Sequence, residues 1–178
     1  MEMRILGIDP GLQVCGYACI DTDGGRDTIV EAGVLRTDGE LPIERRLNQI
    51  AEDVETLLER FRPEVVAVEQ LYAHYAHPRT AILMGHARGV ILQKSAAAGI
   101  EVQSFSATRI KKSLTGNGRA SKEQMQRTIQ TVMALPELPA PADVADAMAI
   151  ALCCGNALAR ERREDQQDLR GPKGLMRI

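Results

Sequence analysis

The sequence predicts an α/β fold: a mixed five-stranded sheet, three antiparallel strands followed by parallel strands, flanked by helices. Residues 4–37 alternate short β-rich runs with tight turns, the pattern of an antiparallel meander. After residue 42, helical periodicity alternates with short continuous apolar runs, which is typical of parallel strands joined by helices. A chain of 178 residues is long enough to bury the core of one such domain.

The three N-terminal strands are predicted at residues 4–9, 14–21 and 28–37. The first reads "RILGID" and ends at a Pro-Gly turn, and the second reads "VCGYACID". An Asp-Gly-Gly turn at residues 23–25 leads into the third, "TIVEAGVLRT".

Helices and parallel strands then alternate. Apolar residues recur at intervals of three and four over residues 43–61, so an amphipathic helix is expected there, ending near Pro63. The run "EVVAVEQ" at 64–70 predicts a strand that is buried on both faces. A second helix is predicted over 77–98 and a fifth strand over 100–106.

The C-terminal third is basic first and helical later. Residues 108–124, "TRIKKSLTGNGRASKEQ", predict a basic, glycine-containing loop that leads into a helix capped by Ser121. A last helix is expected to end near Arg160, before a charged, aperiodic remainder. We therefore expect a folded domain over 1–158 and a mobile tail over 159–178. This element order fits a ribonuclease-H-like layout.

Composition limits the class of protein. No apolar run reaches 18 residues, and the N-terminus reads as a core strand rather than a secretory signal. We therefore expect a cytoplasmic protein without a membrane segment. The four cysteines lie in apolar runs without zinc-binding spacing, which predicts reduced, buried thiols; they are Cys15, Cys19, Cys153 and Cys154.

Charge is segregated along the chain although the net charge is only −2. Residues 21–69 hold 13 acidic and 6 basic residues, whereas residues 79–127 hold 9 basic and 2 acidic residues. A concentrated basic segment indicates a phosphate-binding face. A merely solvated surface is the alternative.

Acidic residues occupy four places where the pattern is otherwise apolar. Asp9 and Glu69 end the first and fourth strands, and Asp143 and Asp146 open the last helix. Each has an ordinary explanation alone, as a turn residue, a solvated strand end or a complement to the helix dipole. However, the spacing of Asp143 and Asp146 puts them on one helix face. If that helix begins where the first and fourth strands are neighbours, all four carboxylates converge.

Four converging carboxylates predict a metal site. Like charges raise one another's pKa, so the cluster cannot stay fully ionised without cations. Hard oxygen ligands without His or Cys select Mg²⁺, with Mn²⁺ as a substitute. Such a cluster can hold one or two ions, and a pair spaced about 4 Å apart can activate water and stabilise the leaving oxygen of a phosphodiester.

Five segments in series resemble the RuvC family of Holliday junction resolvases. They read "ILGIDPG", "VAVEQLY", "GHARGVIL", "TRIKKSLTGNGRASKEQMQ" and "PADVADAMAIAL", and the resemblance spans residues 3–158. A strand ending in DxG also opens actin-like ATPases, so the first segment alone is not specific. The five segments in order are specific.

The resemblance implies a homodimeric, Mg²⁺-dependent endonuclease of ribonuclease-H-like fold, acting in homologous recombination and DNA repair. Such an enzyme cuts two opposed strands of a four-way DNA junction symmetrically, with RuvA and RuvB as branch-migration partners. The family's metal-binding catalytic acids correspond to Asp9, Glu69, Asp143 and Asp146. Family lysines near the site, which contact DNA, correspond to Lys111 and Lys122.

Other DNA-contacting residues follow less directly. Tyr72 matches a position where the family places an aromatic residue against junction bases, although a core tyrosine is the alternative. Nearby His74, Tyr75 and His77 depart from the family segment and are given no role. The remaining basic candidates for DNA binding are Arg109, Lys112 and Arg119.

The helix over 77–98 is apolar almost all round and contains small residues, so it either mediates dimerisation or only covers its own sheet. Three competing functions stay open at this point. They are a related RuvX-type nuclease acting on RNA, an actin-like ATPase, which the chain length disfavours, and a catalytically silent protein that binds DNA structures.

Overall fold

The computed structural model describes residues 2–23, 26–71 and 78–170, and within them five strands and five helices. The elements follow one another along the chain as β1 (Met3–Asp9), β2 (Val14–Asp23), β3 (Arg26–Arg36), α1 (Ile43–Phe61), β4 (Val65–Glu69), α2 (Pro78–Ala97), β5 (Glu101–Phe105), α3 (Ala107–Thr115), α4 (Lys122–Val132) and α5 (Ala142–Arg170).

The five strands form one mixed sheet in the order β3-β2-β1-β4-β5. β1 pairs antiparallel with β2, and β2 antiparallel with β3, which is the predicted meander. β4 lies parallel to β1 on its other side, and β5 lies parallel to β4. The predicted α/β class with a five-stranded mixed sheet is confirmed. Because β1 and β4 are parallel neighbours, their carboxyl ends meet at one edge of the sheet.

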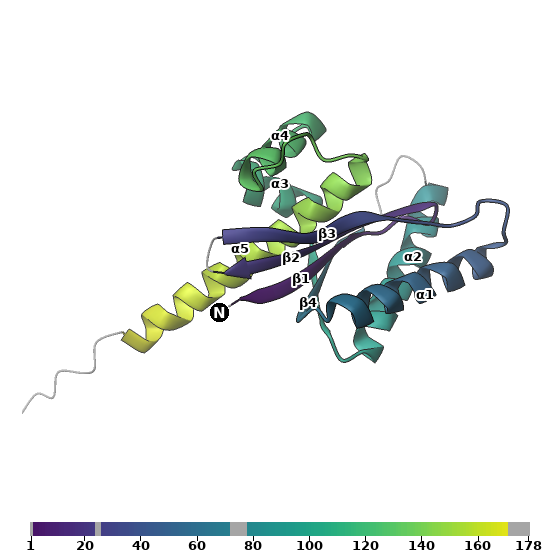
Figure 1. Cartoon of the computed structure of the whole chain (residues 1–178), viewed down its shortest axis with the longest axis horizontal. Coiled ribbons are helices and arrows are strands. Elements are labelled where there is room, and N and C mark those ends of the chain that lie inside the picture. Colours follow the sequence, from purple (N-terminus) through teal and green to yellow (C-terminus); the bar gives the residue numbers. More distant parts are fainter. Residues whose placement is uncertain (1, 24–25, 72–77, 171–178) are drawn as a thin grey trace, which may run out of the picture.

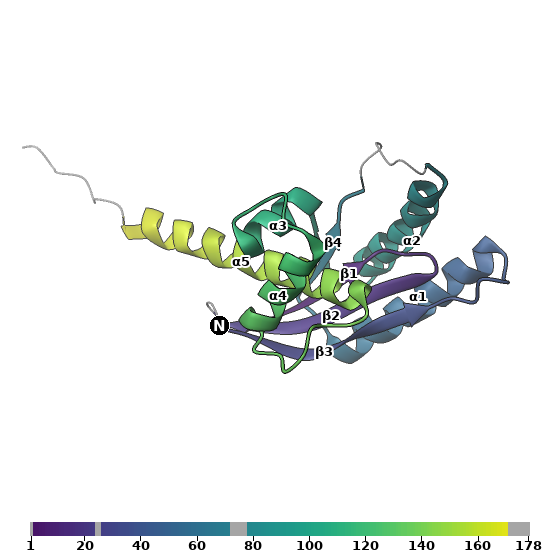
Figure 2. The same ribbon diagram turned by 90° about the horizontal axis from the view of Figure 1, so that it is seen from above.

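Helices cover both faces of the sheet (Figure 1). Side chains alternate between the two faces along each strand. On β4, Val66 and Val68 point to the core under α1 and α2, whereas Val65 and Ala67 point to the core under α5. α3 and α4 lie on the outer side of α5, away from the sheet (Figure 1), so from above they are seen in front of the sheet (Figure 2).

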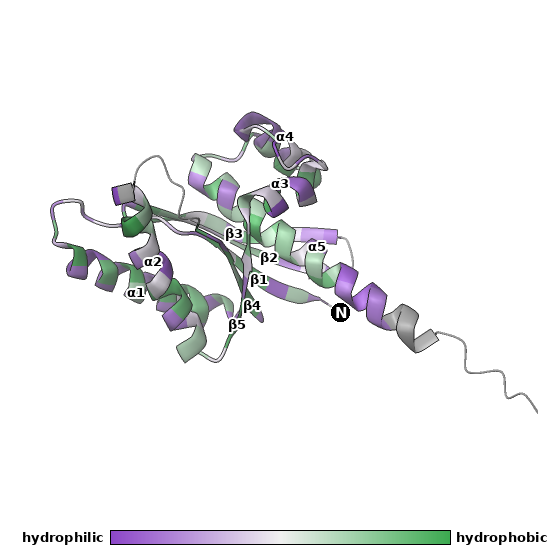
Figure 3. Cartoon of the chain, turned by 180° about the vertical axis from the view of Figure 1, so that it is seen from behind, coloured by the Kyte–Doolittle hydropathy of each residue, from purple (hydrophilic) through white to green (hydrophobic). Residues whose placement is uncertain are grey.

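α5 is the central helix of the second layer. Its residues Val144 to Cys154 are buried except Asp146, and they pack on β1 and β2. Figure 3 shows apolar residues along the part of α5 that crosses the sheet and hydrophilic residues beyond it. In the described ranges α5 alone is long and apolar enough to cross a membrane by length and composition, and 61% of its apolar stretch is buried inside the fold.

Two glycines let α5 approach the sheet closely. A Cβ atom added to Gly7 on β1 would lie 2.4 Å from the carbonyl oxygen of Ala147. A Cβ atom on Gly16 of β2 would lie 2.0 Å from the carbonyl oxygen of Asp143. Both distances are shorter than van der Waals contact, so any larger residue would push the helix away from the strands.

The region predicted as a basic loop is in fact mostly helical. α3 begins after Ser106, whose side chain accepts a hydrogen bond from the Arg109 amide, and ends at Gly116 in the left-handed conformation (φ 75°). Both ends therefore carry standard capping residues, and no Gly or Pro interrupts the helix. The predicted cap of the next helix is confirmed, because Ser121 forms a capping box with Gln124 at the start of α4.

The end of the last helix was also predicted wrongly. α5 continues to Arg170, ten residues beyond the expected end near Arg160. Apolar periodicity stops near Arg160, but Arg, Glu, Gln and Leu are good helix formers, and no Gly or Pro lies between Arg160 and Gly171. The boundary between a domain over 1–158 and a mobile tail over 159–178 stays a prediction. All four cysteines are free and buried, as expected.

Candidate active site

Four half-buried carboxylates come from three elements at one edge of the sheet. Asp9 is the last residue of β1 and Glu69 the last residue of β4. Asp143 and Asp146 lie in the first turns of α5, whose backbone at Asp143 passes over Gly16. Gly16 is paired with Asp9 across the β1–β2 ladder, so this contact brings the start of α5 beside the end of β1. The convergence expected from the sequence is therefore present, while the roles of the four acids stay predictions.

Asp9 is the most strongly perturbed of these carboxyl groups. Burial, followed by the negative charges of Asp146, Glu69 and Asp143, raises its pKa to about 7, although Lys122 opposes the shift. The three other acids are therefore close enough to Asp9 to act on it through space. A group that takes up a proton near neutral pH is typical of a functional cluster.

Glu69 and Asp146 show the same pattern more weakly. The pKa of Glu69 is raised by burial and by Asp146, and the pKa of Asp146 is raised by burial and by Asp143. Lys111 and Lys122 lower both pKa values. The cluster is therefore a concentration of negative charge that two lysines compensate only in part.

The donor set fits a hard divalent cation. The four acids offer only oxygen ligands. Among the described residues Cys15 is near enough for Asp9 and Asp143 to raise its pKa, but burial already raises that pKa to about 12, so the thiol stays protonated and is a poor metal ligand. In the part of the chain that the structure describes, no three His, Cys, Asp or Glu side chains stand close enough together to hold a metal ion. Metal binding would therefore require the carboxylates to move closer together. Their mutual repulsion opposes this movement without a metal, and the positive charge of a bound cation would remove that repulsion.

The predicted basic residues divide between two places. Lys111 on α3 and Lys122 at the start of α4 act on the acids, as described. Arg109 instead lies over the ring of Phe105, with its guanidinium carbon 4.9 Å from the ring centre, and Lys112 faces α5. Arg119 is exposed in the turn between α3 and α4. Tyr72, His74, Tyr75 and His77 lie outside the described residues.

Arg88 of α2 holds the acid-bearing end of β4, a role that sequence reasoning missed. Its Nε donates a hydrogen bond to the carbonyl oxygen of Glu69 at 3.0 Å, and its Nη2 donates to Ser104 Oγ at 2.9 Å. The guanidinium thus joins α2 to β4 and β5 beside the site. The sequence signals only that Arg88 needs a polar partner, because no other Lys, Arg, Asp or Glu lies in residues 80–93; it does not say which group that partner is.

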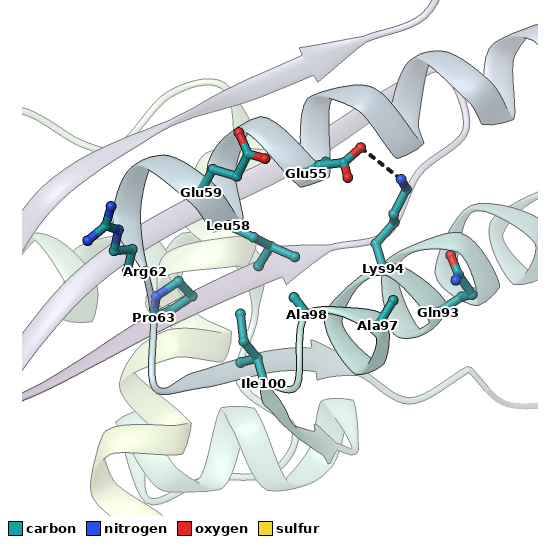
Figure 4. A pocket seen from close by; sticks show the side chains of 10 residues that line it. All are labelled: Glu55, Leu58, Glu59, Arg62, Pro63, Gln93, Lys94, Ala97, Ala98 and Ile100. Atoms are coloured by element: carbon teal, nitrogen blue, oxygen red, sulfur yellow. Dashed lines mark hydrogen bonds and ion pairs between the residues drawn. The ribbon is translucent and has the colours of Figure 1, made fainter.

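A separate groove of about 510 Å³ lies between the C-terminal parts of α1 and α2 (Figure 4). An ion pair joins Lys94 Nζ and Glu55 Oε2 across it at 2.8 Å. Pro63 and Ile100, which precede β4 and β5, line its floor. Because those strands are parallel to β1, this groove lies at the opposite end of the sheet from the acids. It does not belong to the carboxylate site.

The raised pKa of Asp9 predicts how the metal-free protein responds to pH. In the folded state the carboxyl group binds its proton more tightly than in the unfolded chain, where its pKa is about 4. The free energy of unfolding should therefore fall as pH rises from 5 to 8, by up to about 1.4 kcal/mol per pH unit from this group. Urea unfolding in EDTA at several pH values measures it.

The matched variant for this measurement is Asp9→Asn, which cannot ionise. In EDTA at pH 8 it should be more stable than the wild type, and its stability should depend less on pH between 5 and 8. Adding Mg²⁺ at pH 8 should stabilise the wild type more than the variant. If the free energy of unfolding depends on pH in the same way for both proteins, the Asp9 carboxyl does not have the raised pKa.

Comparison with known proteins agrees with the geometry. The family model described as crossover junction endodeoxyribonuclease RuvC matches residues 5–154. A protein of that name from Rhodopirellula baltica is 48% identical over 155 residues, which are 87% of this chain and 86% of that protein. One from Heliobacterium modesticaldum is 42% identical over 156 residues, covering 88% and 96% of the two chains.

A solved structure extends the similarity to three dimensions. Thermus thermophilus RuvC in complex with a Holliday junction substrate superimposes with a TM-score of 0.84 at 32% identity, covering 89% of this chain and 96% of that one. The resemblance noted in the sequence and the ribonuclease-H-like fold are both confirmed. The matched residues include all four acids and nearly all of the sheet. The chain therefore belongs to the RuvC family of crossover junction endodeoxyribonucleases, and its carboxylate edge lies in the part that it shares with these nucleases.

Proposed function

We propose that this protein resolves four-way DNA junctions by symmetric, Mg²⁺-dependent hydrolysis of phosphodiester bonds in paired strands, during homologous recombination and DNA repair. The observation that supports this best is the meeting of four carboxylates and two lysines at the edge of the sheet, in a chain related to a protein solved with a Holliday junction.

Each acid has a part in the proposed reaction. Asp9, Glu69, Asp143 and Asp146 would hold one or two Mg²⁺ ions, for which Mn²⁺ would substitute. When bound, the metal would supply an activated water and stabilise the leaving oxygen. The strands and helix fix where the carboxylates stand, so the scissile phosphate must approach the carboxyl ends of β1 and β4.

The two lysines serve the phosphate. Lys111 and Lys122 are close enough to lower the pKa values of Glu69 and Asp146. The same positions let their ammonium groups bind the scissile phosphate and stabilise charge that develops on its oxygens. Tyr72, just beyond Glu69 in sequence, stacks on junction bases.

The protein works as a homodimer through α2. One face of this helix, with Ala87 and Ile91, is fully buried against its own sheet. The other exposes Ile82 at 61%, and a Cβ atom placed on Gly85 or Gly89 would meet open space. A two-fold related copy on this face would give two active sites for two strands of a symmetric junction. RuvA and RuvB are the proposed branch-migration partners, and the proposed location is the cytoplasm.

A cleavage assay tests the function. The wild type is incubated with a synthetic four-way junction, a linear duplex and a structured RNA, each with and without Mg²⁺. We expect paired, symmetric nicks in the junction alone, only with Mg²⁺, and none with Asp9→Asn.

Other outcomes identify the competing functions. Tight binding of the junction without cleavage in Mg²⁺ or Mn²⁺ would indicate a protein that only binds DNA structures. Trimming of the RNA without junction cleavage would indicate a nuclease of the RuvX type. Either result would refute the proposed function.

A further inference from the structure

A second groove, separate from the carboxylates, lies between α3 and the C-terminal half of α5. Its volume is about 710 Å³, and it is lined only by residues of these two helices. Asn156 Nδ2 donates a hydrogen bond to Ser113 Oγ at 3.2 Å, and this contact joins the two helices. Nothing in the reaction described above uses this groove.

Two pairs of cations face each other across the groove. Arg109 and Lys112 are three residues apart on α3, and Arg160 and Arg163 are three residues apart on α5, so each pair shares one helix face. All four side chains are exposed. Glu161 and Glu164 also line the groove, so cations outnumber carboxylates there by four to two.

These four cations are available to a partner. Of the ion pairs between described residues, none includes Arg109, Lys112, Arg160 or Arg163. Nor are they among the groups that act on the pKa values of the catalytic acids, which respond to Lys111 and Lys122. α3 therefore carries two basic faces, one turned to the active site and one turned to this groove.

We propose that this groove binds the phosphate backbone of a duplex arm of the junction, beyond the point of cleavage. This inference rests on the proposed function and extends it to a second binding surface. Four cations that form no ion pair among the described residues suit phosphate oxygens, as do the hydroxyl group of Ser113 and the amide group of Asn156. The apolar lining is small, namely Cys153, Ala157 and Ala159, and offers no deep pocket for the large apolar anchors on which a protein partner depends.

The helix geometry gives the position of the contact. On α5 the groove extends from Cys153 to Glu164. At 1.5 Å per residue, Cys153 lies about 10 Å and Glu164 about 27 Å from Asp146 along the helix axis. At about 3.4 Å per base pair, an arm that follows α5 brings phosphates roughly 3–8 base pairs from the cut into the groove.

The test measures how junction affinity depends on salt. The variants are Arg160→Gln with Arg163→Gln on one wall and Arg109→Gln with Lys112→Gln on the other; Gln keeps the helix propensity. Each double variant should lower the slope of log K against log salt by up to about 1.8, or about 0.9 for each lost phosphate contact. The control, Arg45→Gln with Arg62→Gln, removes two exposed charges from the two ends of α1, which covers the other face of the sheet, and should leave the slope unchanged.

Two further readouts locate the effect. With saturating enzyme, the single-turnover cleavage rate of Arg160→Gln with Arg163→Gln should stay within twofold of the wild type. Ethylation of phosphates 3–8 base pairs from the cut should weaken binding by the wild type more than by this variant. Circular dichroism confirms that the variants are folded, and because each wall is tested separately, one misfolded variant does not decide the result.

The outcomes separate this inference from the proposed function. An unchanged salt slope in both wall variants, with a wild type that binds and cuts junctions, overturns the groove proposal alone and leaves an acidic protein as the candidate occupant. The same holds if ethylation at 3–8 base pairs has no effect. A wild type that does not bind junctions overturns both proposals.

Discussion

Asp146→Asn should abolish Mg²⁺-dependent cleavage of a four-way junction while leaving junction binding nearly intact. The substitution keeps the size of the side chain but replaces a carboxylate by a neutral amide. Asp146 lies in the acidic cluster, where burial and the charge of Asp143 raise its pKa. Losing one carboxylate ligand should remove about 4 kcal/mol or more of transition-state stabilisation, which corresponds to at least about a thousandfold in rate. Single-turnover cleavage of a labelled junction measures this loss.

The control for this experiment is Asp165→Asn on the same helix. Asp165 is exposed and lies about 28 Å further along α5, so the same chemical change there should leave the rate within twofold of the wild type. Affinity for the junction in Ca²⁺ or EDTA should be similar for both variants and the wild type. If Asp146→Asn cuts at the wild-type rate, Asp146 is not a metal ligand.

Most of the fold could be predicted because burial leaves regular patterns. The first strand and the run at 64–70 are short and apolar, and the periodicity over 43–61 is helical. The spacing of the hydrophobic residues therefore predicts the order of these elements. The four acids stood out for the same reason: each interrupts such a pattern at a strand end or helix start, and the parallel pairing of β1 with β4 brings two of the ends together.

What could not be predicted depends on residues whose local signal is ambiguous. Gly116 and Gly118 suggested a loop, but Gly116 is the C-terminal cap of α3, and the basic residues before it are helical. Because α3 is a helix, Lys111 is directed to the acids and Lys112 to the groove beside α5. The contact of Arg88 with the Glu69 carbonyl joins residues 19 apart in sequence, and no periodicity encodes such a contact.

The close approach of α5 to β2 was equally hidden, and it leads to the second large effect: Gly16→Ala should lose both stability and cleavage. An added Cβ would lie 2.0 Å from the carbonyl oxygen and 2.5 Å from the carbonyl carbon of Asp143. These are backbone atoms, so the start of α5 must move away from β2. We expect a loss of about 1–3 kcal/mol in the free energy of unfolding. A displacement of about 1 Å in the acids should lower cleavage by roughly a hundredfold.

Two matched glycine variants separate displacement of the acids from general loss of stability. Gly39→Ala places its Cβ in open space and should leave both properties unchanged. Gly7→Ala presses on Ala147 and on the Ala151 amide, 2.7 Å away, further along the same helix, and should reduce stability at least as much. Because Gly16 pairs with Asp9 and touches Asp143, its variant should lose more cleavage than Gly7→Ala at equal stability. It should also need more Mg²⁺ for half-maximal rate, since the acids would stand too far apart to share an ion. If cleavage in the two variants simply follows their stability, the contact at Gly16 supports the fold and has no separate part in positioning the carboxylates.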